Sequence, residues 1–305
     1  MGKTYEELDL IDDFLMTAIS SDPYLAEPVN RLLISTLLGR KVGKVNVVAQ
    51  RVIPGVMPGY RGIRMDVEVV EESDCMENIT NLNVYDIEPH TRDDINFPRH
   101  NRYYQAKIDS RYMKTGSDYR TYEKLPNLYV ITILNFDLFG ADYMMYTFEN
   151  KCVEVPELEY RDGLKFIYFN TKGHKGGSEE IRNLLRYIED SSESNVTDET
   201  TSRMHEYVGR IKMLPEVRDA YMTWDMYIKM LEDDKFKEGR EKGELIKLIS
   251  VIKKKIMKKK HIQEISEEIE EDENVVEPIY QFIMEHNGMD VEEIAEMLIK
   301  KKMVH

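Results

Sequence analysis

The stretch IRMDVEVV at residues 63–70, followed after a polar connection by LNVYDIEPH at residues 82–90, decides the fold. Hydrophobic and polar residues alternate along the first segment, which is the period of a half-buried β-strand. Asp66 falls on the polar side of this predicted strand, and Glu88 falls near the end of the next. The alternation predicts that one face holds Ile63, Met65, Val67 and Val69. The parity of the second segment breaks near Val84, so we expect a bulge or a twist there.

Sequence patterns on both sides of this pair of strands indicate a mixed α/β core. A helix is expected over residues 27–39, because Pro28 suits a first helical turn and Gly39 suits the position after the last. The run LYVITILNF at residues 128–136 is typical of a buried central strand. Further helices are expected at 8–19, 99–114 and 178–190, and further strands at 44–51, 143–155 and 164–170.

The composition changes after residue 190. Residues 191–201 are rich in Ser, Thr and acids and resemble a linker, and the chain beyond them has only helical patterns. Residues 253–260 hold six lysines and residues 264–273 hold seven acids, a pattern in which neighbouring helices often pair their charges. We therefore expect a core over residues 1–190 and a helical C-terminal region over residues 191–305.

Composition limits the classes of function. The formal net charge of −15 argues against a broad coat on nucleic acid and leaves room for a local basic patch. No apolar run is long enough to span a bilayer, and the N-terminal residues lack a signal pattern, so no membrane partner and a cytoplasmic location are expected. The two cysteines form no CxxC pair, which leaves no redox motif or zinc ribbon.

Asp66 and Glu88 form the first candidate site. If their strands pair as an antiparallel hairpin, the two carboxylates can converge on one point. Mg²⁺ binds a few hard carboxylate oxygens and keeps several waters, so such a pair could hold it. The alternative is that both acids lie on an ordinary solvated strand face.

The predicted helix at 99–114 is the second candidate site. It carries five cations against one acid, which makes it a local phosphate-binding candidate in an acidic protein. The alternative is a helix whose tyrosines pack inward and whose charges are solvated. The candidate DNA-binding residues are Arg99, Arg102, Tyr103, Gln105 and Lys107.

The blocks RMDVEV, VYDIEPH, PRHNRYYQAKIDSRYMKTG and LPNLYVITILNFDLFG, together with the tail KFKEGREKGELI, resemble the Rpn family of recombination-promoting nucleases, also described as PD-(D/E)XK nuclease family transposases. The resemblance covers roughly residues 10 to 250. It implies a restriction-endonuclease-like mixed sheet flanked by helices. It also implies cleavage of DNA phosphodiester bonds with Mg²⁺ or Mn²⁺, linked to recombination or mobile elements.

By motif position, the resemblance gives Asp66 the first metal-ligand role, Glu88 the second and His90 the third catalytic position. The third position is usually Lys in the wider superfamily and often Gln in this family, and here it is His90 after Pro89. His90 could still orient or deprotonate a water. Glu27 could be the extra acid that some of these nucleases carry, or a helix-terminal acid with a local role.

Two alternatives to an active nuclease stay open. The departure at His90 and Pro89 favours a DNA-binding or regulatory protein whose nuclease fold has lost cleavage. The C-terminal helices could instead form a homo-oligomerisation arm.

Overall fold

The structure is a computed structural model, and it describes residues 3–53, 61–71, 82–92, 94–113, 122, 125–286 and 288–302. The chain divides into two compact units, Met1–Met222 and Thr223–His305. The first unit is mixed α/β and the second is helical. The mixed α/β class and the helical C-terminal region are as expected.

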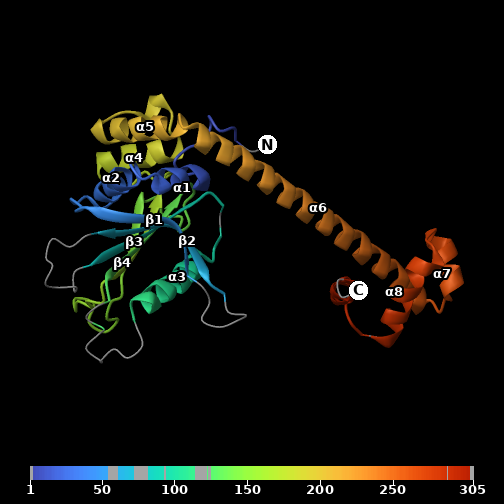
Figure 1. The fold of residues 1–305 in the computed structure, drawn as a ribbon. Coiled ribbons are helices and arrows are strands. Elements are labelled where there is room, and N and C mark those ends of the chain that lie inside the picture. The colour runs from blue at the N-terminus through green and yellow to red at the C-terminus, as the bar shows by residue number, and fades with distance from the viewer. Residues whose placement is uncertain are drawn as a thin grey trace. The chain divides into compact units, whose positions relative to one another are not determined.

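In the described residues, the first unit is built on a six-stranded sheet with the strand order β1-β2-β3-β4-β6-β5 (Figure 1). Strands β1, β2 and β3 pair antiparallel, β3, β4 and β6 pair parallel, and β5 is antiparallel to β6. The strands are β1 (Val45–Ile53), β2 (Ile63–Glu71), β3 (Asn83–His90), β4 (Asn127–Leu134), β5 (Met145–Phe148) and β6 (Leu164–Asn170). Strand β5 is shorter than the strand expected over residues 143–155.

Helices cover both faces of this sheet (Figure 1). One face shares a hydrophobic core with α1 (Asp13–Ser21), α2 (Ala26–Leu38), α4 (Glu179–Glu189) and α5 (Glu199–Lys212). The other face packs on α3 (Phe97–Tyr112) through Ile108. A short 3-10 helix, Glu193–Asn195, lies between α4 and α5.

Local capping explains where two of these helices begin and end. Gly39 follows α2 with a left-handed φ of 60°, and its N–H donates to the carbonyl oxygens of Ser35 and Thr36. Ser178 caps α4, because its hydroxyl oxygen accepts from the N–H of Ile181 at 3.3 Å. Both features stabilise helix ends whose backbone groups lack helical partners.

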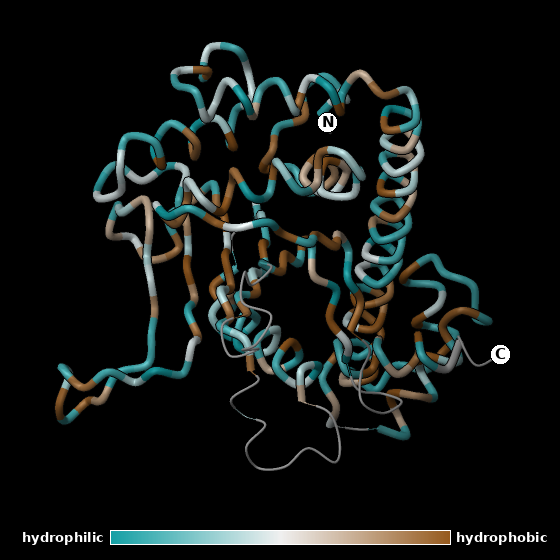
Figure 2. Tube along the Cα trace, turned by 60° about the vertical axis from the view of Figure 1, so that its left-hand side comes forward, coloured by the Kyte–Doolittle hydropathy of each residue, from teal (hydrophilic) through white to brown (hydrophobic). Residues whose placement is uncertain are grey.

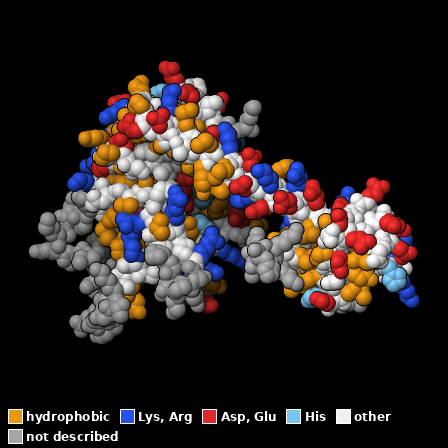
Figure 3. Space-filling view, turned by 45° about the vertical axis from the view of Figure 1, so that its right-hand side comes forward, with side chains coloured by type: hydrophobic (Ala, Val, Ile, Leu, Met, Phe, Trp, Pro, Cys, Tyr) orange, Lys and Arg blue, Asp and Glu red, His pale blue; other side chains and the backbone are white. Residues whose placement is uncertain are grey.

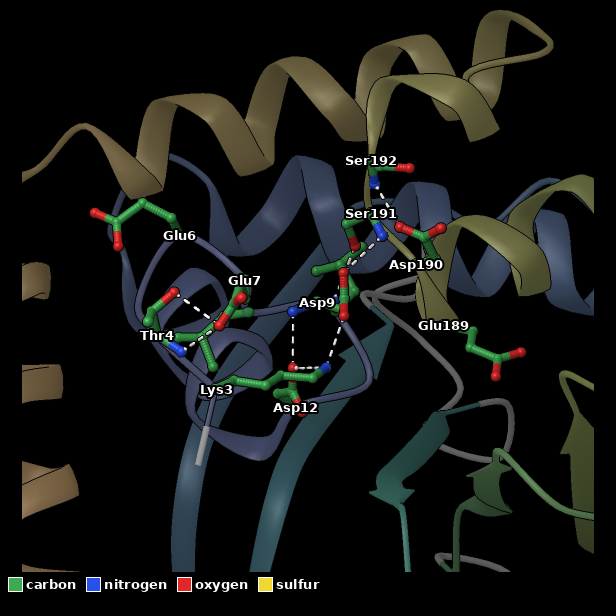
Figure 4. Close-up of polar contacts among 12 residues, drawn as sticks. Lys3, Thr4, Glu6, Glu7, Asp9, Asp12, Glu189, Asp190, Ser191 and Ser192 are labelled. Carbon is green, nitrogen blue, oxygen red and sulfur yellow. Dashed lines mark hydrogen bonds and ion pairs between the residues drawn. The ribbon is translucent and has the colours of Figure 1, made fainter. Parts of the chain in front are cut away.

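The N-terminal segment is fastened to the core by polar contacts (Figure 4). The ammonium of Lys3 lies 2.6 Å from carboxylate oxygens of both Asp9 and Asp12. The Asp9 carboxylate also accepts the backbone N–H of Ser191, just past α4, at 2.8 Å. Residues far apart in sequence therefore close this end of the first unit.

The alternation in β2 changes face at Asp66. Ile63 and Met65 lie in the cluster with α3, whereas Val67 and Val69 lie in the core with α1 and α2. The expectation of one face for these four residues is wrong. The physical reason is Gln50 in β1, which takes a left-handed φ of 55° between the residues paired with Met65 and Val67 and so breaks the two-residue period in the first two strands.

Of the bulge or twist expected near Val84 in β3, the bulge is absent. Val84 pairs in register with both neighbouring strands and faces the α3 cluster, while Tyr85 faces the opposite core. Strand β3 is buried on both faces, so hydrophobic residues need not alternate along it.

The boundary between the units falls inside α6 (Pro215–Met257), later than the expected boundary at residue 190. The reason is that α5 contributes Met204, Val208 and Ile211 to the core of the first unit.

In Figure 2 hydrophobic and hydrophilic segments alternate along α6. Figure 3 shows its Lys and Arg side chains interspersed with Asp and Glu.

The second unit has its own hydrophobic core. It contains α7 (Ile262–Ile269), α8 (Glu273–Glu285) and α9 (Val291–Lys302), packed with the end of α6 around buried residues that include Ile252, Ile265, Phe282 and Ile294. Lys255 and Lys260 both form ion pairs with Glu268, so part of the lysine run pairs with the acidic run. Among the described residues no helix is long and apolar enough to cross a membrane.

Candidate metal centre on strands β2 and β3

The structure brings Asp66 and Glu88 together at the point where β2 and β3 begin to separate. The backbone pairing of the two strands ends at Val67 and Ile87, one residue before this pair. There the backbone N–H of Asp66 donates to Glu88 Oε1 at 3.0 Å. Pro89 follows directly, and because proline has no N–H it cannot extend the pairing with β2.

The two carboxyl groups also contact each other. Burial, and then the negative charge of Asp13, raises the pKa of Asp66 to about 7, against the opposing effect of a side-chain hydrogen bond with Glu88. Burial, followed by the charges of Asp86 and Asp66, raises the pKa of Glu88 well above its usual range. The side chains therefore converge on one small, largely dehydrated volume, in which negative charge is unfavourable.

Glu68 and Asp86 are directly paired across β2 and β3, two residues away along each strand from Asp66 and Glu88. Both are fully buried, with 0% of each residue exposed. Neither acid has a carboxyl oxygen with a hydrogen-bond partner of good geometry among the described residues. The difference between them is that Glu68 forms ion pairs with Arg51 and Arg111, whereas no described Lys or Arg forms an ion pair with Asp86. Burial raises the pKa of Asp86 to about 8, against the opposing effect of a side-chain hydrogen bond with Glu88, and the charges of Asp66 and Glu68 add to the increase.

His90 lies beside this cluster as a neutral imidazole. Its Nε2 atom is 3.8 Å from Glu88 Oε2, and its ring packs against Phe97 with 4.5 Å between centroids. Burial, and then the neighbouring charge of His100, lowers the pKa of His90 to about 4. At neutral pH the ring therefore carries no positive charge, and it is a weaker base than an ordinary histidine.

Sequence reasoning missed Tyr104. Its hydroxyl donates to the backbone carbonyl of Arg64 at 3.0 Å, which ties α3 to the start of β2. Burial, and then the negative charges of Glu88, Asp86 and Asp66, raises the pKa of this phenol. The hydroxyl therefore lies in the field of the acidic cluster. A tyrosine on a helix gives no sequence signal for that placement.

An acid from the helical layer that acts on this site is Asp13. Asp13 lies in the first turn of α1, and its charge acts on the pKa of Asp66. Glu27 forms an ion pair with Arg31 one turn along α2, at 3.3 Å. Glu27 therefore has the local role that the sequence left open as its alternative. The position of Asp13 depends on packing and could not be read from spacing.

The predicted DNA-binding residues on α3 fall into two groups. Arg99 and Arg102 are exposed. The other three take part in contacts within the protein: the Tyr103 hydroxyl donates to the carbonyl of Arg61, the Gln105 amide donates to Asp109, and the Lys107 ammonium lies 5.5 Å from the Tyr103 ring centroid. Arg111, a fourth cation of this helix, is held by Glu68. Lys114 lies outside the described residues.

The donor set of this site fits a hard divalent cation. Asp86 and Glu88 are buried and Asp66 is half-buried, and no described Lys or Arg forms an ion pair with any of them. This is unfavourable unless protons or a cation neutralise the acids. In the part of the chain that the structure describes, no group of three or more His, Cys, Asp or Glu side chains is arranged to hold a metal ion. Two carboxylates with several waters suffice for Mg²⁺, so the pair Asp66 and Glu88 meets that requirement.

Comparisons of the chain with protein-family models, with curated proteins and with solved structures find no match. The fold and the geometry of the acidic cluster therefore define the class of this protein. It is a mixed α/β domain with a helical C-terminal unit and an acidic site where the pairing of β2 and β3 ends.

Proposed function

We propose that this chain is a metal-dependent DNA endonuclease with a restriction-endonuclease-like core, related to the Rpn family and linked to recombination or mobile elements. The observation that carries the proposal is the convergence of Asp66 and Glu88 where β2 and β3 separate. Acids held in this way on rigid strands are suited to a hard cation and a phosphate group.

In this proposal Asp66 and Glu88 hold Mg²⁺ or Mn²⁺. The bound ion would lower the pKa of a water and neutralise charge on the phosphate under attack. His90 would orient the attacking water and take its proton, because its Nε2 atom has no hydrogen-bond partner of good geometry among the described residues. Arg99 and Arg102 contact neighbouring backbone phosphates and position the DNA on α3.

Plasmid nicking tests the proposal. Purified full-length protein should nick supercoiled plasmid with Mg²⁺ or Mn²⁺ and lose this activity with EDTA. Asp66→Ala should abolish nicking, whereas Glu27→Gln, which alters an acid outside the site, should retain it. Equal activity of wild type and Asp66→Ala would remove the site assignment.

A second candidate function is a nuclease-fold DNA-binding or regulatory protein that does not cut. The observation that favours it is the uncharged His90 at the position where the superfamily usually has lysine. Such a protein would bind DNA with a strong dependence on salt and would show no metal-dependent nicking. A clear Mg²⁺-dependent nick that Asp66→Ala removes would exclude this candidate.

A further inference from the structure

Asp86 is a buried acid that neither the hairpin argument nor the family motif uses. It lies two residues before Glu88 on the central strand β3, opposite Glu68 on β2 and beside the apolar Val130 on β4. None of its surface is exposed, and neither carboxyl oxygen has a hydrogen-bond partner of good geometry among the described residues. The side chain that does interact with it by hydrogen bonding, Glu88, is itself an acid and brings no positive charge. A carboxyl group in such a place is unfavourable for folding, so a role limited to structure would be served better by an apolar residue.

Glu68 has cationic partners, and Asp86 on the opposite strand has none among the described residues. Two guanidinium groups, from Arg51 and Arg111, neutralise Glu68 on the same rung. The charged groups that face Asp86 are Asp66, Glu68 and Glu88, and Tyr104 from α3 lies in the same field. The cation that would compensate Asp86 is therefore not supplied by the surrounding described side chains.

We infer that Asp86 is part of the divalent-cation site, as the buried negative charge next to the ligand pair Asp66 and Glu88 that strengthens cation binding. This inference rests on the proposed function and adds a third acid to it. Asp86 acts as a positioning and charge-balancing residue through the cation and its waters. Removing such a partner of a metal site typically weakens metal binding by about 10- to 100-fold.

Calorimetric titration of Mn²⁺ into the full chain tests the inference, with the increase in Tm on Mn²⁺ addition as a second readout. Asp86→Asn keeps the side-chain volume and removes the charge, and it should weaken Mn²⁺ binding by about 10- to 100-fold. Glu68→Gln is the matched control on the same rung: it should lower Tm with and without Mn²⁺ by the same amount and leave Mn²⁺ affinity within about threefold, because Glu68 already has cationic partners.

The outcomes separate the inference from the proposed function. If Asp66→Ala abolishes Mn²⁺ binding and Asp86→Asn binds like the wild type, the inference is wrong and the proposed site stands. If the wild type binds no Mn²⁺, the proposed site is wrong and the inference falls with it. Asp86→Ser is tested beside Asp86→Asn, and unfolding of both variants would show a structural role and overturn the inference.

Discussion

The Asp66 backbone N–H donates to the Glu88 carboxylate at 3.0 Å, one residue beyond the last paired rung of β2 and β3. A side chain thus replaces the backbone acceptor at this position. Glu88 therefore has two separable roles. Its Oε1 atom accepts the Asp66 N–H and fixes the backbone of β2, and the negative charge of its carboxylate is available to a cation.

Glu88→Gln and Glu88→Ala should separate these tasks. In Glu88→Gln the side-chain amide oxygen can still accept the Asp66 N–H, so this variant should stay within about 1 kcal/mol of wild-type stability while losing Mn²⁺ binding. Glu88→Ala leaves a buried donor unpaired and should cost about 1–3 kcal/mol more. Urea unfolding and calorimetry measure the two effects. Equal stability of the two variants would contradict the structural task.

Metal-free protein should become less stable as the pH rises from about 4 to about 8. The pKa of Asp66 is raised to about 7 and that of Asp86 to about 8, against ordinary values near 3.8 in the unfolded chain. The folded state therefore binds more protons than the unfolded state in this window, and the free energy of unfolding falls with pH. Thermal melts in EDTA at half-unit steps measure it. Asp86→Asn should show a shallower decline.

Replacing Glu68 by Gln should strongly destabilise the first unit. The change leaves Arg51 and Arg111 without their buried carboxylate, and breaking a buried ion pair typically costs about 3–5 kcal/mol. Arg99→Ala, an exposed change on α3, should shift stability by less than about 0.5 kcal/mol. Urea unfolding of both variants provides the comparison, and a small effect of Glu68→Gln would show that the pair contributes little.

Arg99→Ala and Arg102→Ala should each weaken DNA binding to a similar degree on unrelated sequences. Each lost phosphate contact should reduce the slope of log affinity against log salt by about 1. Fluorescence anisotropy over a salt series measures that slope. Arg161→Ala, an exposed arginine in an ion pair with Glu159, is the control and should leave the slope unchanged.

The C-terminal helices remain our candidate for homo-oligomerisation. In α6 the apolar residues 224, 228 and 231 recur at the spacing of four and three residues that coiled-coil seams use. The double change Ile228→Glu and Leu231→Glu should lower the mass of any oligomer seen by sedimentation, while Lys235→Glu should not. A mass that both variants share with the wild type would leave this seam no role in assembly.

The sequence allowed the α/β class, the helical C-terminal region and the pairing of Asp66 with Glu88 to be predicted, because each leaves a local pattern. The change of face at Asp66 could not be predicted, since it depends on one backbone angle at Gln50 in another strand. Asp86 was missed for a related reason: an acid in a fully buried strand has the same spacing as an acid on a solvated face. The placement of Asp13 and Tyr104 near the site depends on how α1 and α3 pack on the sheet. The spacing of residues within one helix does not predict that packing.

The left-handed residue at position 50 makes the length of the first strand inflexible. Gln50 is also tied to α1, because its amide donates to the Thr17 hydroxyl at 2.9 Å. Deleting one residue from β1 before this point would exchange inward and outward side chains for that half of the strand alone. A change in the length of β1 before Gln50 would therefore disturb the packing of the strand on α1, whereas a substitution at an exposed position would leave the register unchanged.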